Sequence, residues 1–122
     1  MAKPASKPVD LEHLNGYTGG DDALNRQILG LFDSQCIEII GKLSEFADHG
    51  ETEAAAKKWR DVVHSLKGAS RSVGAFELGD VAAQLEKISL SNHSQALEAL
   101  QKLKVKAAQV HQFIDDLVKE SA

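Results

Sequence analysis

The chain has 122 residues, which suits one domain with a single hydrophobic core and leaves no room for a kinase with its own nucleotide-binding domain. Apolar residues make up 43% and charged residues 26%, values typical of a globular protein, so the body of the chain is not disordered. The net charge of -4 argues against nucleic acid as the main partner.

The single cysteine and the lack of long apolar runs indicate the cellular compartment of the protein. A single cysteine, Cys36, cannot form an internal disulfide or the thiolate cluster of a zinc or iron-sulfur site. The sequence has no run of about 18 apolar residues, and Met1 to Pro8 lack the apolar segment of a secretory signal. We therefore expect a cytoplasmic protein that binds neither membrane nor nucleic acid.

The first residues predict a tail followed by a short helix. Both prolines of the chain fall within the first eight residues. We expect residues 1–9 to form a flexible tail and residues 10–120 to form one domain. Asp10 is a suitable N-cap for a short helix, which the turn Thr18-Gly19-Gly20 ends because glycine tolerates positive φ angles.

Four longer segments follow, and each has apolar residues spaced three and four apart, which predicts amphipathic helices and no strands. A loop over residues 89–94 precedes the last of them, with Ser94 as its expected N-cap. The segments run from Asp21 or Asp22 to His49, from about Glu51 to Gly74, from about Phe76 to Ile88, and from Ser94 to about Leu117.

Helices of this length with short connections bury their apolar stripes most simply by packing antiparallel around one core. The fold class predicted is therefore all-α: an up-and-down antiparallel four-helix bundle with a short additional N-terminal helix.

The third segment has a polar face centred on His64. At about 100° per residue, Lys57, Arg60, Lys67 and Arg71 all lie within about 60° of the histidine, and Asp61 is the one acidic residue among them. Apolar residues such as Trp59 and Leu66 lie on the opposite side. We therefore expect His64 to be exposed on a surface that attracts anions.

Gly68 lies one turn beyond His64 on the same face, although glycine there costs a helix about 1 kcal/mol relative to alanine. One interpretation is that bare backbone lets a large partner approach the imidazole, and the other is that the glycine relieves a contact between helices. Neutral imidazole is nucleophilic near pH 7, and the surrounding cations would offset the charge of a phosphoryl group.

No phosphate-binding loop, HExxH or GxSxG pattern is present, which argues against catalysis by the chain alone. An exposed histidine is usually just a surface residue. The histidines at other positions show no metal-ligand spacing, and we interpret them as structural or surface residues: His13, His49, His93 and His111.

Residues 64–78, HSLKGASRSVGAFEL, resemble the signature HxLKGxxxxxGxxxL of histidine-containing phosphotransfer (HPt) domains of bacterial phosphorelays. The resemblance continues into Leu85-Glu86, and Gly19-Gly20-Asp21 and Phe32 are similar to a weaker upstream pattern. It implies that His64 accepts a phosphoryl group, that Lys67 stabilises it, that Gly68 admits a receiver domain, and that Gly74 ends or bends the helix.

The resemblance also implies a residue from the following helix near the histidine, for which Glu86 is the first candidate and Gln84 the second. A carboxylate there would fix the imidazole tautomer. Five further positions are expected to contribute to the receiver interface, the first two as a basic rim and the others as its apolar part: Arg60, Arg71, Leu11, Leu14 and Ile28.

The function implied is a phosphocarrier without kinase or phosphatase machinery. It would take a phosphoryl group from the phosphoaspartate of a hybrid-kinase receiver and pass it to the receiver of a response regulator. We expect a monomer without a cofactor, with the receiver supplying the aspartate and Mg²⁺. The alternative is a helical adaptor that binds signalling partners without being phosphorylated.

Overall fold

The computed structural model describes residues 7–49 and 52–120, and all regular secondary structure in these ranges is helical. This agrees with the all-α class expected from the spacing of apolar residues. The helices are α1 (Leu11–Thr18), α2 (Asp22–His49), α3 (Glu53–Val73), α4 (Phe76–Glu86) and α5 (His93–Glu120).

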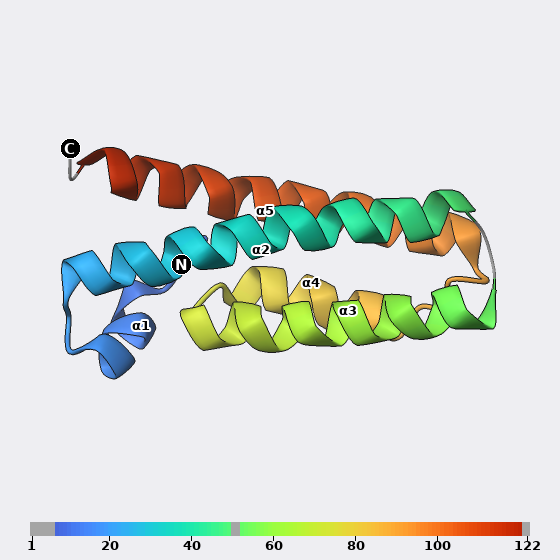
Figure 1. Ribbon diagram of the computed structural model, residues 1–122, viewed down its shortest axis with the longest axis horizontal. Helices are drawn as coiled ribbons and strands as arrows, with labels where there is room; N and C mark the ends of the chain where they lie inside the picture. The colour runs from blue at the N-terminus through green and yellow to red at the C-terminus, as the bar shows by residue number, and fades with distance from the viewer. Residues whose placement is uncertain (1–6, 50–51, 121–122) are drawn as a thin grey trace, which may run out of the picture.

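The four helices after α1 run alternately in opposite directions, which confirms the predicted up-and-down bundle (Figure 1). Helix α2 packs against α3 and α5, and α4 packs against the same two helices, so α2 and α4 lie diagonally across the bundle. The short helix α1 packs against α2 and α3 at one end of the bundle. Among the described residues, no helix combines the length and apolarity needed to cross a membrane.

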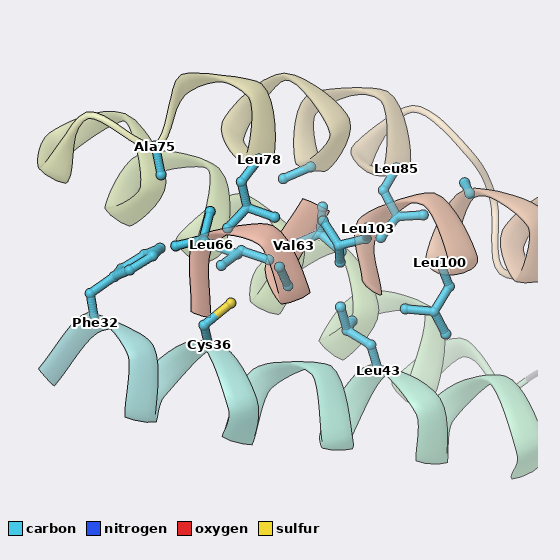
Figure 2. Packing of buried hydrophobic residues seen from close by; sticks show 14 of the residues in the cluster. Phe32, Cys36, Leu43, Val63, Leu66, Ala75, Leu78, Leu85, Leu100 and Leu103 are labelled. Carbon is cyan, nitrogen blue, oxygen red and sulfur yellow. The ribbon is translucent and has the colours of Figure 1, made fainter. Parts of the chain in front are cut away.

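The core consists of the apolar stripes of the four long segments, which meet along the axis of the bundle (Figure 2). Burial of each large aliphatic side chain contributes about 1.5–3 kcal/mol to folding, so the stripes decide how the helices associate. The side chains that Figure 2 shows turned toward the centre come from all four helices: Phe32, Cys36 and Leu43; Val63 and Leu66; Leu78 and Leu85; Leu100 and Leu103.

Gly74 joins the end of α3 to the start of α1. It is the C-cap of α3 with φ 91°, and its carbonyl accepts a hydrogen bond of 2.9 Å from the backbone N–H of Asp10. A Cβ at this position would lie 2.5 Å from the carbonyl oxygen of Asp10. Both the left-handed backbone and the close approach therefore require glycine.

The N-terminal boundary differs from the prediction. Residues 1–6 of the predicted tail lie outside the described residues, but Val9 is fully buried in the core. Asp10 caps α1 as expected, by accepting a hydrogen bond from the N–H of His13. Val9 and Leu14 then occupy the two positions of a hydrophobic staple, which explains why Val9 is part of the domain.

Two other helix ends are shifted. Helix α5 begins at His93, because the carbonyl of Asn92, not of Ser94, accepts the first helical hydrogen bond, from Ala96. Helix α4 ends at Glu86, and Lys87 and Ile88 only donate to carbonyls three residues back. The buried side chain of Leu90 lies on the chain that leaves this end, which local spacing in the sequence does not reveal.

Cys36 is expected to react slowly with thiol reagents in the folded protein. Its burial, and secondly the negative charge of Asp33, raise the pKa of the thiol to about 11. At pH 8 only about one thiol in a thousand is then ionised, and the thiolate is the reactive form. We expect DTNB to react far more slowly with the native chain than with the urea-unfolded chain, and equal rates would contradict this burial.

Candidate functional site

His64 lies on the solvent side of α3, as the helical periodicity predicts. Its side chain is 68% exposed, whereas Trp59, Val63 and Leu66 on the opposite side of the same helix are fully buried. The helix begins at Glu53, with Thr52 as N-cap, and continues unbroken to Val73. The histidine is therefore held on a rigid, well-anchored element.

Helix α4 places a carboxylate against the imidazole. Glu86 Oε1 lies 3.1 Å from His64 Nδ1, and Glu86 Oε2 lies 2.8 Å from Lys67 Nζ. Gln84, the second candidate for this contact, is exposed and lines a different cavity beside α5. The structure therefore brings Glu86, and not Gln84, to the histidine.

The charge of Glu86 determines which nitrogen of His64 is free. Hydrogen bonding to Lys67, and next to His64, holds the pKa of the Glu86 carboxyl below its usual value of 4.5, with burial opposing the shift. An ionised carboxylate can only accept, so Nδ1 of the imidazole must carry the proton that it donates. In the neutral ring the lone pair is then on Nε2, and this nitrogen is the nucleophile.

Gly68 leaves the surface next to His64 open. A Cβ built at this glycine meets no atom within 4 Å, so a contact with a neighbouring helix does not account for the residue. The hydroxyl of Ser72 donates to the carbonyl of Gly68 at 2.9 Å. The backbone of this turn is therefore both accessible and internally hydrogen-bonded.

The positive charge around His64 is lower than α3 alone would suggest, because α4 adds carboxylates to the same face. Glu86 pairs with Lys67, and Asp80 Oδ1 lies 3.4 Å from Nη2 of Arg71. Arg60 is exposed and forms no ion pair with another described residue. The angular positions of residues around α3 cannot show the charges that α4 contributes to the same face.

The predicted apolar residues occupy different environments. Leu14 is only 2% exposed and belongs to the core, Leu11 is half-buried, and Ile28 is half-buried at the edge of a shallow cavity of about 260 Å³. Tyr17, which was not among the residues expected at the interface, is 73% exposed. Its signal was an aromatic residue directly before the Thr18-Gly19-Gly20 turn. The cavity is lined by Leu14, Tyr17, Ile28, Ser72 and Val73.

Another histidine resembles His64 in part. His111 on α5 is half-exposed, and its Nδ1 lies 2.8 Å from Asp33 Oδ2. It lacks the two other features of the site, since Asp33 has no lysine partner among the described residues and no glycine occurs on α5. His13 instead packs edge-on against Tyr17 and Phe76. An exposed imidazole with a carboxylate is therefore not by itself what distinguishes His64.

The chemistry available to this site is nucleophilic attack by Nε2 on a group brought from solution. No group of three histidine, cysteine, aspartate or glutamate side chains that could hold a metal ion occurs in residues 7–49 and 52–120. The site combines an oriented nucleophile, an adjacent cation and an uncovered turn of helix.

Comparison with known families agrees with this description. Residues 27–120 match the family model described as the Hpt domain. The match covers α3, α4 and α5 completely, together with most of α2. No curated protein and no solved structure matches the chain.

Proposed function

Because the chain belongs to the Hpt domain family, whose members are phosphocarriers in phosphorelays, we propose that His64 is its phosphoryl-accepting residue. The group would come from the phosphoaspartate of a hybrid-kinase receiver and pass to the aspartate of a response-regulator receiver. The observation that carries this proposal is the contact of Glu86 with Nδ1, which leaves Nε2 of an exposed imidazole free.

The transfer step follows from this tautomer. The lone pair of Nε2 attacks phosphorus and forms the N–P bond while the P–O bond to the receiver aspartate breaks. The electron pair of the broken bond stays on the aspartate, which leaves as a carboxylate. The Nδ1 proton remains on the ring, where Glu86 stabilises the positive charge that develops. In the reverse step the ring leaves as neutral imidazole.

Lys67 is the cation placed to stabilise the phosphoryl group. Its ammonium has three donors, and Glu86 is its ion-pair partner. The ammonium of Lys67 can therefore stay paired with Glu86 while another of its N–H groups donates to a phosphoryl oxygen. The carboxylate also holds the lysine side chain close to the histidine, which reduces the entropy lost when the phosphoryl group binds.

The receiver would approach over Gly68 and cover the imidazole. Ile28, the neighbouring Tyr17 and the half-buried Leu11 would supply apolar contact, with a smaller contribution from Leu14 because it is almost fully buried. Arg60 and Arg71 would lie at the rim. We expect the receiver to supply Mg²⁺ together with its aspartate.

The proposal is tested by phosphotransfer profiling. The chain is mixed with each phosphorylated hybrid kinase and receiver of the same genome, and separately with phosphoramidate as a small chemical donor. We expect rapid labelling by at least one receiver, with a linkage that is labile in acid and stable in alkali. Binding to a receiver without any labelling would instead support the alternative of a non-phosphorylated adaptor.

The substitution Lys67→Ala is expected to slow transfer from a phosphorylated receiver by about tenfold to a hundredfold, because the cation that offsets the phosphoryl charge is lost. Its side chain points away from the core, so circular dichroism and cooperative thermal unfolding should be retained. Lys58→Ala, on the same helix but outside the histidine face, is the control. A full transfer rate for Lys67→Ala would exclude this role.

A further inference from the structure

A cavity of about 370 Å³ lies beside His64, on the side away from Gly68. On α3 it is lined by Ala56 and Arg60, two turns and one turn before the histidine. Its other wall is the end of α4 and the chain that follows, residues 86–90. Glu86 therefore belongs both to this cavity and to the contact with His64.

The cavity has an excess of positive charge. Arg60 and Lys87 line it, and neither has an ion-pair partner among residues 7–49 and 52–120. The acidic residue in the lining is Glu86, whose two oxygens already contact His64 and Lys67. Two cations next to the site are thus left without a neutralising carboxylate.

The lining of the cavity includes neither His64 nor Lys67, the two residues that would contact the phosphoryl group. Glu86, which lines the cavity, contacts Nδ1, whereas the phosphoryl group would be carried by Nε2, the other nitrogen of the ring. We therefore assign the two cations to contact with a protein docked over His64, and not to the group being transferred.

The wall after α4 is preformed. The N–H groups of Lys87 and Ile88 donate to the carbonyls of Gln84 and Leu85. These hydrogen bonds also satisfy two carbonyl groups at the C-terminal end of α4. The hydroxyls of Ser89 and Ser91 lie 2.7 Å apart. Leu90 is almost fully buried and anchors this segment to the core. Little ordering would thus be required when a side chain enters the cavity.

We propose that this cavity is a specificity pocket that binds an acidic side chain of the receiver, with Arg60 and Lys87 as its cationic ligands. The aliphatic parts of Ala56, Ile88 and Leu90 suit the stem of a glutamate or aspartate. The inference rests on the proposed function and adds to it: receivers with a carboxylate at the matching position are accepted, and those with a cation there are rejected by like-charge repulsion.

The test uses the full chain and the receiver that profiling identifies as its fastest donor. We expect Lys87→Glu to raise KM for the phosphorylated receiver by about tenfold or more, with a smaller change in kcat and a weaker dependence on salt. Lys58→Glu changes the net charge equally but lies outside the cavity, and should leave KM unchanged within about twofold. Replacing the matching receiver carboxylate with lysine should restore KM for the Lys87→Glu variant.

Other outcomes would overturn the inference. The inference is wrong if KM is unchanged for Lys87→Glu, if KM rises equally for Lys58→Glu, or if no receiver variant restores KM. Each of these results would show that the cavity does not bind a carboxylate of the receiver. Slower labelling of Lys87→Glu by phosphoramidate would show that the lysine serves the phosphoryl group instead. Failure of the proposed function is distinguishable, because the wild-type chain would then not be labelled at His64 by either donor.

Discussion

The substitution His64→Gln is expected to abolish phosphoryl labelling, from phosphorylated receivers and from phosphoramidate alike. Glutamine fills similar space and remains polar, but its amide has no nitrogen lone pair that can form a stable bond to phosphorus. Since the residue is exposed on α3, the fold should be retained and the receiver should still bind. The measurement is labelling followed by acid and alkali treatment, with circular dichroism for the fold.

His111→Gln is the matched control for this experiment. It removes another exposed histidine whose Nδ1 contacts a carboxylate, but this carboxylate has no lysine partner among the described residues and α5 has no glycine. The control variant should be labelled like the wild type. If His64→Gln is labelled at the wild-type rate, or if labelling is lost in His111→Gln, the phosphoryl acceptor is not His64.

The substitution Gly68→Gln is expected to raise the stability of the protein and to slow phosphoryl transfer from the receiver. A Cβ at this position meets nothing within 4 Å, and glutamine is a better helix former, so the free energy of unfolding should rise by about 0.5 kcal/mol. The same side chain would stand where the receiver approaches, so transfer from the receiver should fall on the order of a hundredfold. Labelling by phosphoramidate, which is small, should fall much less.

Gly41→Gln is the control, since Gly41 is an exposed helical glycine on α2 and a Cβ there also meets nothing within 4 Å. It should gain similar stability and keep full transfer. Unfolding is followed by urea titration, and transfer by rapid quench. If Gly68→Gln transfers at the wild-type rate, the receiver does not pass over this turn. If Gly68→Gln is less stable than the wild type, the added side chain meets neighbouring atoms, and the space around Gly68 is not open.

The arrangement of His64, Lys67 and Gly68 could be predicted from the sequence because it depends on one helix. Positions three and four apart lie on one face whatever the rest of the protein does. The same local rule gave the buried residues Trp59 and Leu66 on the other side. The cap at Asp10 and the end of α3 at Gly74 were equally local, since each depends on the conformation of a few adjacent residues.

The choice between Glu86 and Gln84 could not be made in this way. The two residues flank the buried Leu85 at about 100° on either side, so the pattern of α4 alone treats them equally. Glu86 faces α3 and Gln84 faces α5 because of the order in which the four helices surround the core. That order is a property of the bundle and not of any single helix.

The sequence by itself thus determined the helical class, the up-and-down topology and the exposed face of His64, since these follow from helical periodicity and from the burial of apolar stripes. Tertiary structure decided which carboxylate orients the imidazole, that Asp80 offsets the positive charge of Arg71, and that Val9 belongs to the core. It also placed Lys87 beside Arg60 around one cavity. The physical reason is that each of these depends on the relative position of two elements that packing alone fixes.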